Sequence, residues 1–216
     1  LQNRIIDSGH AEFALVAVRS QGTLSTIFQY EKIIQQNNYK YLPSKPPGTL
    51  LFYEVTNLLA SKFNSKNMPI ERFLMFASIL WPIIPYFAVI FMFLLAKEYF
   101  DNETALDALL IYICVPSLTL INMHTDQIIY PLLAVFSLLL AVIGFRKNNL
   151  WLSFSSGIMY YCASFFSFGL MVVGIFYLIP VLVMLSKEFP KHLRIALLHV
   201  FTIVFGAFIA GFITWY

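Results

Sequence analysis

The protein is a chain of 216 residues in which hydrophobic residues make up 59% and charged residues only 12%, with a formal net charge of +3. So few charged groups cannot cover a water-facing surface, which excludes an ordinary soluble domain and indicates a polytopic membrane protein. The basic residues are dispersed between apolar runs, so the small positive charge does not point to a nucleic acid partner.

The ends and the cysteines add little to this class assignment. Cys114 and Cys162 both fall inside apolar runs, and we interpret them as small core residues rather than as a disulfide. The chain begins at Leu1 without a methionine and stops at Tyr216 directly after an apolar run. We therefore expect a piece, truncated at both ends, of a longer membrane protein.

The chain divides near Arg72 into a mixed first part, residues 1–72, and a second part, residues 73–216, of apolar runs joined by short polar loops. Helices are predicted in the first part over residues 11–18, 23–36 and 47–63. Their apolar spacing is typical of amphipathic helices that lie in the membrane interface rather than cross the bilayer.

The stretch "SKPPG", residues 44–48, stands at the start of the third of these helices. Pro46 and Pro47 fix two backbone φ angles, and Pro47 suits the first turn of a helix. Gly48 lets another group approach the backbone, while the helix start and Lys45 supply positive potential for an anion such as a phosphate. The alternative is a rigid connector in which Lys45 extends to water.

Six membrane-spanning helices are predicted in the second part. The first, residues 73–95, is uncharged over about 23 residues, enough for a bilayer core of about 30 Å, and Pro82 and Pro85 are expected to kink it. The others cover residues 105–121, 127–145, 150–163, 169–185 and 195–216. The predicted fold class is all-α, a polytopic transmembrane helical bundle with interfacial amphipathic helices in a long external loop.

Loop charge predicts the orientation of these spans. The loops over residues 97–104, 146–149 and 187–194 carry six Lys or Arg residues, whereas the turns over residues 122–126 and 164–168 carry none. By the positive-inside rule the first set is cytoplasmic, and the two turns share the external face with the first part of the chain. The expected location is a plasma or inner membrane, with the active face external.

The external turn "NMHTDQ" contains the only acidic residue of the two short turns, Asp126, with His124 two residues before it. An ionisable residue at membrane depth is a functional candidate, and His with Asp suits a divalent metal, a phosphate or an acceptor. The alternative is that Asp126 caps the next helix and His124 faces water. Whether the protein uses a metal cofactor stays open.

Other polar residues are interpreted structurally. Thr104 and Asp107 have the spacing of a capping box at a helix start, and Tyr160 and Tyr161 are interpreted as packing residues. The sequence contains no Ser-His-Asp pattern, no phosphate-binding glycine loop and no CxxC.

Four stretches in order resemble the GT-C superfamily of integral membrane glycosyltransferases, which includes protein O-mannosyltransferases and aminoarabinose lipid A transferases. "AEFALVA" looks like the acidic stretch of the family's first external loop, and "SKPPGTLLFYEVTNLL" like the Lys/His-Pro-Pro stretch that follows it. "ERF" is similar to the arginine that opens the second membrane helix, and "VPSLTLINMHTDQIIYPLLAVFSLLLA" resembles the Pro-x(n)-Asp turn after the third. The resemblance covers nearly the whole chain, as the amino-terminal portion of such an enzyme.

The resemblance implies roles for individual residues. The family's catalytic carboxylate, which takes a proton from the acceptor, corresponds to Asp7 or Glu12, with Asp126 supporting the base or a metal. The site that binds the donor phosphate corresponds to Lys45, Gly48 and Arg72.

The implied function is transfer of a sugar from a polyprenyl-phosphate-linked donor to a lipid, glycan or protein acceptor at the external face. Membrane lipids are the surrounding partners. The alternatives are a membrane transporter subunit, which needs polar residues within its spans, and a non-catalytic membrane scaffold.

Overall fold

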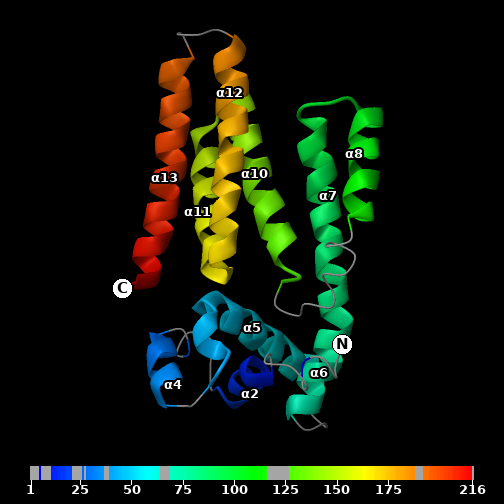
Figure 1. Ribbon diagram of the computed structural model, residues 1–216, viewed down its shortest axis with the longest axis vertical. Helices are drawn as coiled ribbons and strands as arrows, with labels where there is room; N and C mark the ends of the chain where they lie inside the picture. Colours follow the sequence, from blue (N-terminus) through cyan, green and yellow to red (C-terminus); the bar gives the residue numbers. More distant parts are fainter. Residues whose placement is uncertain are drawn as a thin grey trace. The chain divides into compact units, whose positions relative to one another are not determined.

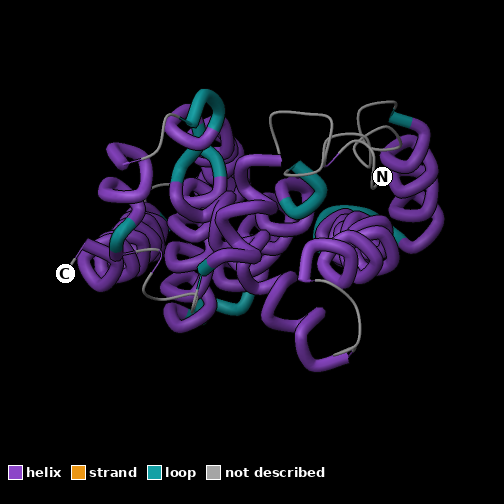
Figure 2. Tube along the Cα trace, turned by 90° about the horizontal axis from the view of Figure 1, so that it is seen from below, coloured by secondary structure: helices purple, strands orange, loops and turns teal. Residues whose placement is uncertain are grey.

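The computed structural model describes Ile5, Thr26 and residues 11–20, 28–36, 39–63, 69–115, 127–187 and 192–215. Within these residues every regular element is a helix, as the sequence predicts, and Figure 2 shows the helices joined by short loops. The chain forms two compact units. Unit 1 contains the described residues up to Pro85, residues 127–129 and Phe165–Ser167; unit 2 contains Tyr86–Val115, Tyr130–Ser164 and the described residues from Phe168 onward.

The elements that the structure describes in unit 1 include four α-helices and a short 3-10 turn. They are α2 (Ala11–Arg19), α4 (Tyr30–Gln36), η1 (Leu42–Ser44), α5 (Pro47–Phe63) and α6 (Pro69–Leu80). The predicted helices over residues 11–18 and 47–63 are confirmed, and α4 confirms the second half of the helix predicted over residues 23–36, whose residues 23–25 and 27 lie outside the described part. α2, α5 and α6 pack against one another.

Aromatic rings from these helices form the centre of unit 1. Tyr53 of α5 is fully buried, and its ring centroid lies 5.5 Å from that of Phe13, 6.0 Å from Phe73 and 5.1 Å from Trp81. The indole N–H of Trp81 donates to the Thr56 hydroxyl at 3.1 Å, so the buried ring keeps a polar partner. This packing gives unit 1 a core of its own.

Unit 2 contains α7 from Tyr86 onward and the helices that follow. Figure 1 shows α10 to α13 running alongside one another. The elements are α7 (Ile84–Lys97), α8 (Asn102–Cys114), α10 (Tyr130–Arg146), α11 (Leu150–Phe166), the 3-10 helix η4 (Phe168–Tyr177), α12 (Leu178–Lys187) and α13 (Leu193–Trp215).

Glycines bring the backbones of α11 and α13 close together. A Cβ atom added to Gly157 would lie 1.9 Å from the carbonyl oxygen of Ile203, and one added to Gly206 would lie 2.3 Å from that of Phe154. Small residues at such crossings are typical of helices packed inside membranes, where close backbone approach supplies the van der Waals contact.

A buried polar network joins α13 to α11 and to the turn that precedes α11. His199 is fully buried, with Nδ1 2.7 Å from the Ser153 hydroxyl and Nε2 3.0 Å from Oδ1 of Asn148, and its ring stacks on Phe145. Asn148 takes a positive φ of 48°, which an asparagine in a tight turn tolerates. Both ring nitrogens are therefore satisfied within unit 2.

In the part of the chain that the structure describes, three segments are long and apolar enough to cross a membrane: Pro69–Lys97, Phe168–Ser186 and Leu193–Thr214. They coincide with the first, fifth and sixth predicted spans. α10 and α11 have 17 residues each and α8 has 13, so these helices are shorter than the three long segments. The expected kink near Pro82 is a 3-10 turn, η2 (Trp81–Ile83), between α6 and α7.

The structure differs from the helix predictions at one helix start and adds a detail to one span. The capping box at Thr104 and Asp107 is wrong, because α8 begins at Asn102 and the Asp101 carboxylate caps it by accepting from the backbone N–H of Thr104 at 2.8 Å. The span predicted over residues 169–185 is helical, and within it the part as far as Tyr177 is a 3-10 helix.

Candidate functional site

The predicted anion site lies in unit 1, in the connection between α4 and α5. We call its residues 39–46 the Lys45 loop. The loop contains η1, and Lys45 follows it with extended backbone angles of φ −118° and ψ 152°. The Lys45 N–H donates to the carbonyl oxygen of Leu42 at 3.3 Å, which closes the turn. The side chain of Lys45 is half-buried.

Glu12 of α2 holds the first half of this loop. Its carboxylate accepts from three consecutive backbone N–H groups, those of Lys40 at 2.9 Å, Tyr41 at 2.8 Å and Leu42 at 2.9 Å. Bonds from backbone N–H groups to an ionised carboxylate are among the stronger hydrogen bonds in proteins. A side chain 28 residues away in the sequence thus fixes the course of the loop.

The same bonds determine the ionisation of Glu12. Partial burial alone would raise its pKa, but the three backbone N–H groups and the nearby charge of Lys40 outweigh burial and lower the pKa. A carboxylate with a lowered pKa and three bonded amides is a poor proton acceptor. The structure therefore gives Glu12 a positioning role in the loop.

Tyr30 of α4 holds the second half of the loop. Its hydroxyl lies 2.8 Å from the carbonyl oxygen of Leu42 and 2.7 Å from that of Lys45, and the side chain is buried. Burial raises the pKa of Tyr30 to about 12, so the hydroxyl keeps its single proton at neutral pH and shares it between these two carbonyl oxygens. Leu42, between the two anchors, is fully buried in the core of unit 1.

The start of α5 is covered by a segment distant in sequence. A Cβ atom added to Gly48 would lie 2.4 Å from the carbonyl oxygen of Phe165, and the Thr49 hydroxyl donates to the carbonyl oxygen of Phe166 at 3.1 Å. The group that approaches the Gly48 backbone is therefore the main chain of residue 165. This packing accounts for the glycine without a ligand.

Of the predicted site residues, Glu12 bonds to the first half of the loop that contains Lys45, and Gly48 follows this loop in the first turn of α5. Arg72 lies in the first turn of α6, within unit 1, with its side chain half-buried. Asp7, His124 and Asp126 lie outside the described residues, so their expected place near Lys45 stays a prediction.

A metal site is not visible in the part of the chain that the structure describes. No three His, Cys, Asp or Glu side chains are grouped there in a way that could hold an ion. The residues predicted to bind a divalent cation, His124 and Asp126, fall in residues 116–126, which are not described. The metal therefore remains an expectation from the sequence.

Glu54 of α5 is a buried acid that the sequence analysis did not single out. Its side chain is 2% exposed, and neither carboxylate oxygen has a hydrogen-bond partner among the described residues. Burial raises its pKa, although the hydroxyls of Thr26 and Ser20 lie near enough to oppose this in part. The signal in the sequence was a single acid inside the apolar run "LLFYEVTNLL".

Comparison of the chain with protein-family models, with curated proteins and with solved structures gives no match.

Proposed function

We propose that the chain is the amino-terminal portion of a polytopic membrane glycosyltransferase of the GT-C type. It takes a sugar from a polyprenyl-phosphate-linked donor and transfers it to a lipid, glycan or protein acceptor on the external face. Two kinds of support underlie the proposal. One is the order of the sequence stretches that resemble this superfamily, and the other is the construction of unit 1 around the Lys45 loop.

The membrane setting is supported by the distribution of side chains in unit 2. Large apolar side chains lie on its outside: Phe201, Val204 and Phe208 of α13 are 66%, 61% and 65% exposed. Polar side chains lie inside, where Ser153 and His199 are fully buried. This is the reverse of a water-soluble bundle, and it suits helices whose outer faces contact lipid.

The observation that carries the proposal is the double anchoring of the Lys45 loop. The Glu12 carboxylate and the Tyr30 hydroxyl hold backbone groups of residues 40–42 and 45, so the position of the Lys45 Cα is set before any ligand arrives. A cation held in place stabilises charge that develops on a leaving phosphate more effectively than one that must reorganise. In the proposed reaction, Lys45 faces the phosphate of the lipid donor, and Arg72 assists from α6.

The proposed general base is Asp7. The resemblance leaves Asp7 and Glu12 as candidates, and the three backbone bonds of Glu12 support assigning proton transfer to Asp7 and loop positioning to Glu12. Asp126, with His124, remains the proposed support for the base or for a divalent cation.

The rival interpretation is a transporter subunit, which requires ionisable groups along a path through the spans. His199, an ionisable side chain within α13, is fully buried and is bonded at both ring nitrogens. His199 therefore resembles a structural residue that links helices more than a residue of a transport path. A scaffold without activity would not need a lysine on a doubly anchored loop.

The experiment is a donor turnover assay with the full-length protein in lipid nanodiscs. Polyprenyl-phosphate-linked mannose, glucose and aminoarabinose are each supplied with membranes from the source cells as acceptor, and release of polyprenyl phosphate is measured. We expect turnover of at least one donor and, for Asp7→Asn, a loss of about 10²-fold or more, the contribution of a general base. Glu31→Gln, at an exposed acid on α4, is the matched control. Absence of turnover with all three donors, or full activity of Asp7→Asn, contradicts the proposal.

A further inference from the structure

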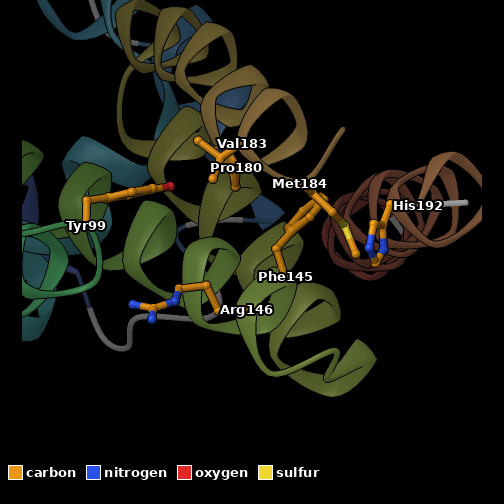
Figure 3. A pocket seen from close by; sticks show the side chains of 7 residues that line it. All are labelled: Tyr99, Phe145, Arg146, Pro180, Val183, Met184 and His192. Atoms are coloured by element: carbon orange, nitrogen blue, oxygen red, sulfur yellow. The ribbon is translucent and has the colours of Figure 1, made fainter. Parts of the chain in front are cut away.

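Unit 2 contains a cleft of about 170 Å³ that belongs to neither the Lys45 loop nor the proposed reaction. Figure 3 shows the seven side chains around it, with the Tyr99 hydroxyl directed toward Pro180 and Val183. Tyr99 follows the end of α7, Arg146 is the last residue of α10, and His192 directly precedes α13. The cleft therefore lies at one end of unit 2, among the loops with the predicted cytoplasmic charges.

Two polar groups in the cleft have bonding capacity that the described residues of unit 2 do not use. The Tyr99 hydroxyl is buried and has no hydrogen-bond partner within the described residues. Arg146 bonds to Glu98 only through Nη1, which contacts the Glu98 carboxylate at 2.8 Å and also the Glu98 carbonyl oxygen. A guanidinium has five N–H donors, so most of them remain available to an oxygen-rich ligand.

The Tyr99 hydroxyl is suited to donating to such a ligand. Burial, with a smaller contribution from the charge of Glu98, raises the pKa of Tyr99, and the opposing effect of Arg146 does not cancel this. The hydroxyl is therefore protonated at neutral pH. An unpartnered buried hydroxyl costs folding free energy unless something else bonds to it, which makes a ligand oxygen the natural partner.

The remaining wall of the cleft is apolar. Phe145, Pro180, Val183 and Met184 form it, and the last three belong to the span Phe168–Ser186, in which only 6% of the most apolar window is buried. A soluble anion would gain nothing from such a wall, whereas a lipid can place its phosphate at the polar end and its chains along α12. Basic pockets between membrane helices on the cytoplasmic side commonly bind anionic lipid head groups.

We propose that this cleft binds the phosphate of an anionic phospholipid of the cytoplasmic leaflet. The Tyr99 hydroxyl donates a hydrogen bond to a phosphate oxygen. Arg146 donates hydrogen bonds to the phosphate from the guanidinium nitrogens that do not contact Glu98. The acyl chains lie against the apolar residues of α12. The proposal concerns a structural lipid and does not depend on the glycosyltransferase activity.

The test is native mass spectrometry of the full-length protein released from micelles titrated with dioleoyl phosphatidylglycerol or dioleoyl phosphatidylcholine. We expect one retained phosphatidylglycerol at concentrations where phosphatidylcholine is lost. Tyr99→Phe is expected to weaken that retention about tenfold, which corresponds to the loss of one hydrogen bond to a charged group. Lys147→Gln removes a neighbouring positive charge that does not line the cleft, and should change retention less than twofold.

A second measurement separates binding from folding. Because the Tyr99 hydroxyl has no partner among the residues that the structure describes, Tyr99→Phe should unfold at the wild-type temperature or slightly above it when no anionic lipid is present. Added phosphatidylglycerol should then raise the unfolding temperature of the wild type and not of the variant. Equal retention by Tyr99→Phe and wild type, equal retention of the two lipids, or binding of inorganic phosphate alone would overturn the proposal.

Discussion

Replacement of Glu12 by alanine tests whether the Lys45 loop is held as the structure indicates. The change leaves the N–H groups of Lys40, Tyr41 and Leu42 without their acceptor. Hydrogen bonds to charged groups contribute about 1.5–3 kcal/mol each, but the bonds of Lys40 and Tyr41 are exposed, and water replaces their acceptor. We therefore expect a local destabilisation of the loop of about 2 kcal/mol, not the sum of three bonds.

Limited digestion by trypsin reports this directly, because the peptide bond after Lys40 lies within the anchored segment. A destabilisation of about 2 kcal/mol raises the open population, and hence the cleavage rate after Lys40, by about 30-fold. Glu31→Ala, at an exposed acid on α4, is the matched control and should be cut at the wild-type rate. Cleavage of Glu12→Ala at the wild-type rate would refute the anchoring.

The same contact has a definite pH dependence. The pKa of Glu12 is lowered in the folded protein. Its contribution to the stability of the loop is therefore fully present above the ordinary pKa of 4.5 and is lost as the pH falls through the lower folded pKa. The difference between wild type and Glu12→Ala should therefore be constant from pH 6 to 8 and disappear in acid. Cleavage by pepsin, which acts in acid, should not distinguish the two proteins.

Three further predictions concern other parts of the chain. Gly157→Leu should destabilise unit 2 by about 3 kcal/mol or more, seen as a lower unfolding temperature in detergent, because even a Cβ atom would lie 1.9 Å from the Ile203 carbonyl oxygen. Glu54→Gln should raise the unfolding temperature at pH 8 and have little effect at pH 4. The pKa of Glu54 is raised in the folded protein, so the neutral carboxyl favours folding at low pH, and this stabilisation is lost as the pH rises through the folded pKa. Equal shifts of the unfolding temperature at pH 4 and pH 8 would contradict this. Cysteines at residues 146–149 of the full-length protein should resist an impermeant thiol reagent in intact cells, and labelling there would invert the predicted topology.

Local signals in the sequence were sufficient to predict several elements of the fold. The bounds predicted for α5, residues 47–63, are those of the structure, because Pro47 suits the first turn of a helix and the apolar spacing continues to Phe63. The irregular turn at Trp81–Ile83 follows from Pro82, which cannot donate in a helix interior. The sequence prediction missed Asp101 as the N-cap of α8, although an aspartate three residues before Thr104 is also a local signal for a helix start.

The contacts that define the candidate site were not predictable in this way. Glu12 reaches a loop 28 residues later, and the carbonyl oxygen that faces Gly48 belongs to Phe165. Such contacts depend on how helices pack, which a single sequence does not encode in any short pattern. The resemblance offers Glu12 as one of two candidates for the base, and no short pattern in the sequence reveals that its carboxylate bonds to three backbone amides.

The most direct measurement of the central claim is donor turnover by Lys45→Ala in the full-length protein. Two variants are compared with it: Lys45→Arg, and Lys62→Ala, which removes an exposed charge from the other end of α5. If Lys45 stabilises charge on the leaving phosphate, Lys45→Ala should lose about 10²-fold or more in turnover, the effect of removing one such donor, and Lys45→Arg should recover part of it. Lys62→Ala should remain at the wild-type rate, and tryptic cleavage after Lys40 should be unchanged in all three variants. Transfer by Lys45→Ala at the wild-type rate would show that the lysine is only part of a connector, and would contradict the account.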